Sequence, residues 1–265
     1  VLAVSPPVTL LLERGNNDGL VFLLVLISVR WRGPFRTPFF IALAGGLKVF
    51  PLAALPFVFR LKNPVPYLLA LVITSSMLVS AFVDLREIHL AKEASERLSY
   101  GIPSFARLFG AYMPKFPGYE FTNSMLTLLS AAIFTLAVLL AYFLFRKAYH
   151  RLADQVEKSK NDTYILVIFG TIFLFTMLVS TNWAYRIVFA SPVAWLAFNW
   201  LFDRQEMAMS DRLLLVILNT ALFGAFWVFL APYGHILFNV VTFGAAAVIY
   251  PSVTIVAIHR FSASR

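Results

Sequence analysis

Long apolar runs recur along the whole of this chain and alternate with short clusters of charge. Of the 265 residues, 60% are hydrophobic and only 13% are charged, whereas a soluble domain carries about 25% charged residues. In lipid, backbone polar groups must be satisfied within helices or closed barrels. We therefore predict an all-α, polytopic transmembrane bundle that forms a single domain over residues 1–265. The runs cover residues 18–31, 37–60, 65–83, 124–145, 163–181, 187–202, 213–230 and 236–258.

The charged clusters predict which face of the membrane each loop occupies. Basic residues gather in cytoplasmic loops, and the loop 146–162 and the turn 30–36 are rich in Lys and Arg. Both are expected inside. The stretch 84–123 has five basic and five acidic residues and is expected outside. The net charge of +9 is explained by these loops, and no basic patch with interleaved aromatics points to nucleic acid.

Segment 37–60 decides whether this topology is consistent. A single ordinary span there would place 84–123 inside, against its balanced charge. Two half-length helices, bent near Lys48 and Pro51, put every loop on the side that its charge favours. Proline removes a backbone donor and clashes with the preceding turn, so a break at Pro51 is physically reasonable. We predict a broken hairpin with Lys48 at its tip and about nine membrane segments in total; a single tilted helix is the alternative.

The outer stretch 84–123 carries an amphipathic pattern. Phe105, Leu108, Phe109 and Tyr112 follow the spacing i, i+3, i+4, i+7 of one helix face. A weaker stripe covers residues 85–91. We expect two interfacial helices that lie on the membrane.

This topology gathers several polar clusters on the outer face. They are residues 13–18, the Lys48 tip, the stretch 84–123, residues 182–186 and residues 232–235. Ionisable groups set against apolar runs are functional-site hypotheses by default. Any chemistry is therefore expected outside.

Four motifs in order resemble a known family. They are Ser5-Pro6-Pro7 with Glu13-Arg14-Gly15-Asn16 and Asp18, then Arg-x-Arg-Gly-Pro ending at Pro34, then Gly-Gly-Leu-Lys48-Val-Phe-Pro51, and finally Asn182-Trp183-Ala184-Tyr185-Arg186. Together they resemble the GT-C glycosyltransferases, and most closely the bacterial polyprenyl-phosphate-mannose-dependent mannosyltransferase family. The resemblance covers most of the chain. It implies an extracytoplasmic active site in the bacterial inner membrane, a polyprenyl-phosphate sugar as donor and no obligatory cofactor.

Three cations are candidates to hold the donor phosphate. Lys48 offers a compact charge with three hydrogen donors, Arg186 a bidentate clamp, and Arg14 a second cation. Each has a structural alternative: a lysine that snorkels to the interface, an arginine that anchors or forms an ion pair, and an arginine that pairs with Glu13 or Asp18.

Glu13 and Asp18 are the carboxylates best placed to act as a general base on an acceptor hydroxyl. For Asn17 and Asp18 we prefer a helix N-cap role, because such residues before an apolar helix are ordinary caps. The resemblance also implies a catalytic Asp or Glu in the first outer loop, which would lie upstream of residue 1. Candidate sugar- or acceptor-binding residues, each with a helix-end or solvated-rim alternative, are Asn16, Asn17, Asn182, Asp84 and Arg86.

Other classes of site find little support in the sequence. No His/Asp/Glu spacing suggests a zinc site, so no metal is assigned. A Walker loop and a G-x-G-x-x-G motif are both missing, which disfavours a nucleotide-sugar donor. Two alternatives remain open: a non-catalytic GT-C-like subunit of a membrane complex, with other membrane proteins as partners, and a lipid or solute transporter, which would need a polar path to the inner face.

Overall fold

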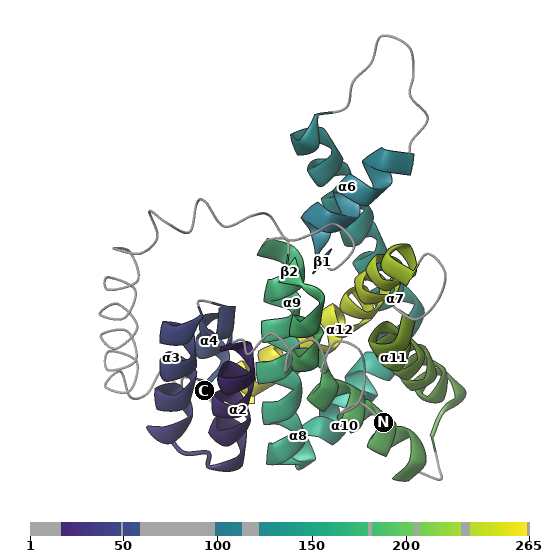
Figure 1. The fold of residues 1–265 in the computed structure, drawn as a ribbon. Coiled ribbons are helices and arrows are strands. Elements are labelled where there is room, and N and C mark those ends of the chain that lie inside the picture. Colours follow the sequence, from purple (N-terminus) through teal and green to yellow (C-terminus); the bar gives the residue numbers. More distant parts are fainter. Residues whose placement is uncertain are drawn as a thin grey trace.

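The computed structural model describes residues 17–48, 50–58, 99–112, 122–179, 182–203, 207–228 and 234–263 (Figure 1). This part of the chain is helical apart from one pair of two-residue strands. The helices are α2 (Asp18–Arg30), α3 (Arg36–Leu47), α4 (Leu55–Val58), α6 (Ile102–Tyr112), α7 (Asn123–Lys158), α8 (Lys160–Tyr164), α9 (Gly170–Val179), α10 (Ser191–Asp203), α11 (Met209–Trp227) and α12 (Gly234–Ala263). Between them lie two 3₁₀ segments, η2 (Phe50–Ala54) and η5 (Ala184–Ala190), and the π-helical turn η4 (Ile165–Phe169).

Four helical stretches are long and apolar enough to cross a membrane: Met125–Val156, Lys160–Leu178, Met209–Trp227 and Ile236–Ile258. They indicate a membrane-embedded, all-α protein. α2 and α3 have only 13 and 12 residues, or about 20 Å at 1.5 Å per residue, against a hydrocarbon core of about 30 Å. The predicted count of about nine segments is therefore not confirmed, and the run 65–83 lies outside the described residues.

The connection predicted over residues 146–162 is almost entirely helical. α7 has 36 residues and continues to Lys158, with one non-helical residue at Phe145 (φ −116°, ψ 17°). The apolar run thus ends where the prediction placed it, at residue 145. The backbone kinks at this residue, and the helix continues after it. Hydropathy locates the end of a span, while the Ala, Leu, Arg, Lys and Gln residues that follow are good helix formers.

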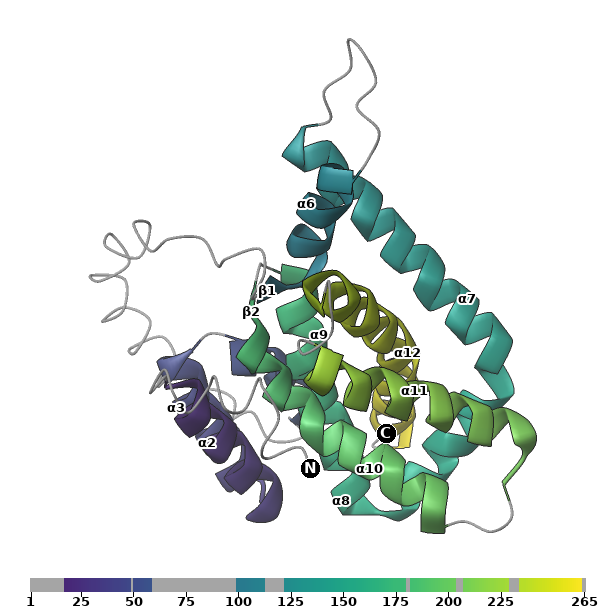
Figure 2. The same cartoon turned by 45° about the vertical axis from the view of Figure 1, so that its right-hand side comes forward.

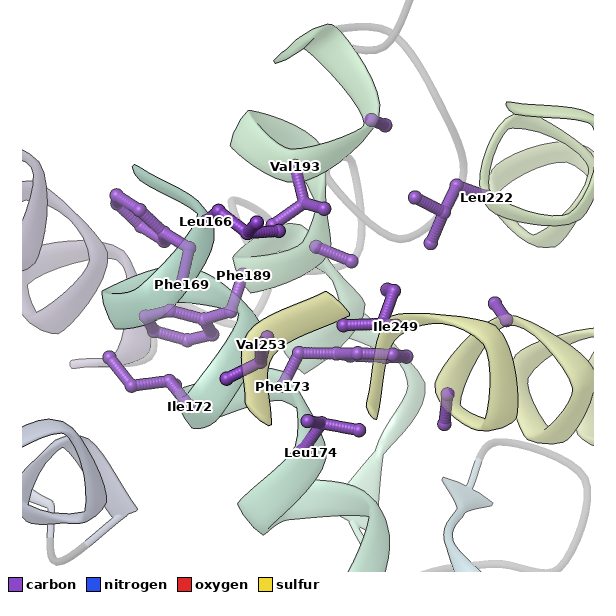
Figure 3. Close-up of a cluster of buried hydrophobic side chains, with 14 of the residues drawn as sticks. Leu166, Phe169, Ile172, Phe173, Leu174, Phe189, Val193, Leu222, Ile249 and Val253 are labelled. Atoms are coloured by element: carbon purple, nitrogen blue, oxygen red, sulfur yellow. The ribbon is translucent and has the colours of Figure 1, made fainter. Parts of the chain in front are cut away.

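The core lies where α9, η4 and η5 meet α12 (Figure 3). Phe173, Ile249 and Val253 converge there, and all three are buried. A Cβ on Gly170 would lie 2.6 Å from Cγ2 of Val253. Glycine at this position therefore lets α12 approach the start of α9 closely.

Helix α6 is present, and part of its apolar face packs on protein. α6 lies at the far end of α7 from α8 and α10 (Figures 1 and 2). The Phe105 ring stacks on Phe243 of α12 with centroids 4.4 Å apart, and Ile102 and Ala106 are buried. Periodicity alone predicts an amphipathic helix and leaves open what covers its apolar face. The second expected helix, at residues 85–91, lies outside the described part of the chain.

The helix that begins at Arg36 is interrupted at Lys48, as the sequence predicts. Lys48 is extended (φ −152°, ψ 135°), although its N–H still bonds Ala44 O. In a continuous helix, Gly45 and Leu52 would be about 10 Å apart along the axis. Instead, a Cβ on Gly45 would lie 2.6 Å from Cγ of Leu52. The chain therefore folds back on itself between these two residues.

Candidate functional site

An ion pair joins two motifs that are 168 residues apart in sequence. Nε of Arg186, in η5, donates to Oδ2 of Asp18 at 3.2 Å. Asp18 is the first residue of α2 and its side chain has no solvent exposure, while that of Arg186 is 17% exposed. A buried carboxylate needs such a partner, because desolvating an unpaired charge costs several kcal/mol.

Aromatic rings around the ion pair pack α2, η2 and η5 together. Cζ of Arg186 lies 5.3 Å from the centroid of the Phe50 ring, within cation–π range. The Phe50 ring also meets Phe189 edge-on at 5.1 Å, and Phe189 meets Phe22 at 5.6 Å. Phe22 is one helical turn after Asp18, and Phe189 follows Arg186 by three residues. Thus α2 and η5 are joined twice, and η2 contacts η5 at both points.

Lys48 is close in sequence to the Phe50 ring of this arrangement. It ends α3 and precedes Phe50 by two residues, so their Cα atoms are within about 7 Å. Its side chain is partly buried. Asp18, Arg186 and Lys48 together carry a net charge of +1, which suits a monoanionic or dianionic ligand better than a neutral one.

A short strand pair leads into the site. Tyr100 of β1 (Ser99–Tyr100) pairs with Asn182 of β2 (Asn182–Trp183) in an antiparallel ladder. Gly101 follows β1 with φ 117°, a conformation that favours glycine. The middle of the predicted outer stretch 84–123 is therefore paired with the motif that carries Arg186.

The structure thus brings together Asp18, Arg186, the Lys48 turn and the backbone of Asn182. The N-cap interpretation is wrong for Asp18, and for Asn17 it holds for the position alone. Asn17 occupies the N-cap position, but it is exposed and makes no side-chain cap bond, while Asp18 is already helical and bonds Arg186. Five other predicted site residues lie outside the described part of the chain: Glu13, Arg14, Asn16, Asp84 and Arg86.

A second ion pair, which the sequence analysis missed, links α7 to α11. Nε of Arg151 donates to Oδ2 of Asp211 at 2.9 Å, and Nη2 donates to Ser210 Oγ at 2.8 Å. Asp211 is buried in the first turn of α11. The sequence held one signal for this pair: Asp211 stands directly before an apolar run, and a buried carboxylate there needs a cationic partner.

Comparison of the chain with protein-family models, with curated proteins and with solved structures finds no match in any of the three. Within the described ranges, no group of three or more His, Cys, Asp or Glu side chains is placed to hold a metal ion.

Proposed function

We propose that this protein is a GT-C-type membrane glycosyltransferase that moves a hexose, in the first instance mannose, from a polyprenyl phosphate to an extracytoplasmic glycan or lipid acceptor. One observation carries the proposal. The guanidinium of Arg186 lies between the Asp18 carboxylate and the Phe50 ring, at the turn that follows Lys48. Three of the four motifs that support the resemblance, far apart in sequence, are close together at this point.

The chemistry requires cations near the bond that breaks. When the hexose leaves, negative charge develops on the phosphate oxygen, and preorganised positive groups stabilise that charge most where water is excluded. Lys48 is the proposed contact to the phosphate. Arg186 is held by Asp18 and Phe50, so its guanidinium is positioned before the donor binds and little ordering is needed afterwards.

The ion pair changes the role that we propose for Asp18. A carboxylate that is fully buried and bonded to Arg186 is poorly placed to take a proton from an acceptor hydroxyl, since a base must reach that proton. We assign Asp18 a positioning role. Glu13 is the proposed catalytic base.

The proposed pocket opens on the extracytoplasmic face. One feature of the fold supports this side. Asp18 and Arg30 are at opposite ends of α2, so the basic turn 30–36 is separated from the ion pair by the length of that helix. By the positive-inside rule the basic turn is cytoplasmic. The reversal at Lys48 is then the tip of the broken hairpin, near the outer surface of a bacterial inner membrane.

A specific observation also favours the alternative of a non-catalytic subunit. Arg186 has a protein partner, and an ion pair with supporting aromatics would be kept in a scaffold that has lost its chemistry. A transporter finds less support, because the carboxylate of each ion pair described above lies at a helix end: Asp18 begins α2, and Asp211 is in the first turn of α11.

The test is hexose transfer in proteoliposomes that contain polyprenyl-phosphate [¹⁴C]mannose. The proposal predicts transfer to an added acceptor lipid, and at least a tenfold loss for Lys48→Ala with no loss for Lys158→Ala, an exposed lysine in the last turn of α7. Label that enters the vesicle lumen without transfer would identify a transporter. Neither transfer nor uptake, together with copurifying membrane subunits, would identify the non-catalytic subunit.

A further inference from the structure

A groove at the kink of α7 combines apolar and basic side chains. Its lining residues are Phe143, Leu144, Phe145, Arg146, Lys147 and Ala148 of α7, with Ser210 of α11, and its volume is about 350 Å³. The groove lies at the point where Phe145 departs from helical geometry (φ −116°, ψ 17°). It is separate from the Asp18–Arg186 site in both its residues and its helices.

The groove lies at the depth of lipid headgroups. The apolar part of α7, residues 125–145, spans about 31 Å at 1.5 Å per residue, which matches a hydrocarbon core of about 30 Å. Charged residues begin at the next position, Arg146. The kink therefore falls where the acyl region ends and the headgroup region begins.

The groove offers two cations. Arg146 and Lys147 are exposed, and within the described residues no ion pair or hydrogen bond of their side chains is found. Arg151, one turn further along, is committed to Asp211 and Ser210 instead. That network fixes Ser210, which forms the opposite wall, while the charges at positions 146 and 147 stay uncompensated.

An apolar stripe leads away from the groove along α7. Leu129, Leu136, Leu140 and Phe143 are 36%, 66%, 57% and 70% exposed. Their spacing of 7, 4 and 3 residues keeps them on one face of a helix. The stripe is about 21 Å long, which is close to the length of an extended phospholipid acyl chain.

We propose that this groove binds one anionic phospholipid of the leaflet that faces the basic loops. Its headgroup phosphate contacts Arg146 and Lys147, and one acyl chain lies along the stripe from Phe143 to Leu129. Basic pockets between helices on the cytoplasmic side are suited to anionic headgroups. A zwitterionic lipid would leave the net charge of the groove uncompensated, so the site discriminates by charge. This inference is independent of the proposed glycosyl transfer.

Native mass spectrometry of the whole chain in detergent, titrated with phosphatidylglycerol or phosphatidylcholine, tests the proposal. We expect one phosphatidylglycerol to bind more tightly than the rest. Changing Arg146→Gln and Lys147→Gln together should weaken that binding at least about tenfold, and Phe143→Ser should weaken it several-fold. Binding of phosphatidylcholine should not change. All three residues are exposed, and a retained melting temperature confirms that the variants fold.

Two controls make the result decisive. The double variant Arg30→Gln/Arg32→Gln removes two exposed cations from another basic turn and should leave the tight phosphatidylglycerol unchanged. Equal losses in both double variants would show diffuse charge attraction and overturn the site. Millimolar inorganic phosphate should not displace the lipid. Full displacement by phosphate, or an unchanged affinity in Phe143→Ser, would mean a phosphate site without an acyl contact.

Discussion

Nε of Arg186 lies 3.2 Å from Oδ2 of Asp18, and this contact joins the start of α2 to η5 across 168 residues of sequence. The carboxylate is wholly buried and the guanidinium mostly so. Breaking such a pair leaves an uncompensated buried charge, whereas removing both partners does not. The stability of the whole site should therefore depend on the pair as a unit.

Removing one partner should be costly and removing both should be less so. Asp18→Asn and Arg186→Gln should each lower the free energy of unfolding by about 3–5 kcal/mol. The double variant should lose less than the sum of the two, with a coupling of about 1–3 kcal/mol. Equilibrium unfolding in mixed micelles measures the free energy of unfolding of the parent, the two single variants and the double variant. Additive losses would show that the two side chains do not interact.

The pair between Arg151 and Asp211 provides a contrast, because Arg151 is more exposed. Its side chain is 40% exposed against 17% for Arg186, and solvent screens a partly exposed pair. Arg151→Gln leaves Asp211 buried without its partner, so it should still be destabilising, but by less than Arg186→Gln, and it should leave binding of polyprenyl phosphate unchanged. A loss of that binding equal to the loss in Arg186→Gln would place both pairs in one functional network, contrary to the separation described above.

The reversal at Lys48 should depend on the close approach of Gly45 and Leu52. A methyl group on Gly45 would lie 2.6 Å from Cγ of Leu52, so Gly45→Ala should lower the free energy of unfolding by about 1–3 kcal/mol. Gly45→Ala should cost less in a Leu52→Ala background than in the parent chain, because the shortened side chain at position 52 leaves room for the added methyl group.

Gly244 in α12 is the matched control for Gly45. A Cβ there would meet no atom within 4 Å, so Gly244→Ala should be neutral or stabilising by up to about 1 kcal/mol. Thermal unfolding in detergent compares the two single variants. Similar behaviour of Gly45→Ala and Gly244→Ala would contradict the reversal.

The Phe50 ring should stabilise the site by more than the apolar volume that it buries, because of its aromatic contacts. Phe50→Leu keeps most of the buried volume but removes the ring from Arg186 and Phe189. We expect a loss of about 1–2 kcal/mol, since aromatic pairs and cation–π contacts are each worth about 0.5–1.5 kcal/mol. Phe35→Leu, at the exposed residue that precedes α3, should change the free energy of unfolding by less than about 0.5 kcal/mol. Equal effects would show that only apolar area matters at position 50.

The sequence predicts the helical membrane class and the ends of several apolar runs well. The run 18–31 corresponds to α2, and the end predicted at residue 145 coincides with the kink at Phe145. Hydropathy is a local property, and the boundary between lipid and water is read directly from it. The same reasoning fails beyond residue 145, because charged residues end a membrane span without ending a helix.

The side-chain pairs were harder to predict from the sequence than the helices. The sequence suggests that Asp18 and Arg186 share a face, and it leaves the cap and the ion pair as rival interpretations. Which one holds depends on how η5 packs on α2, a long-range relationship that no local pattern encodes. The partner of Asp211 and the protein surface beneath Phe105 were missed for the same reason.

Binding of sugar-free polyprenyl phosphate to the purified protein, measured for the parent chain, for Lys48→Ala and for Lys158→Ala, tests the central claim most directly. The account predicts that Lys48→Ala raises the dissociation constant at least about tenfold, as expected when a cation that contacts a phosphate is lost, while Lys158→Ala leaves it unchanged. Equal dissociation constants for all three proteins would show that the Lys48 turn holds no phosphate, and the proposed transferase would lose its donor site.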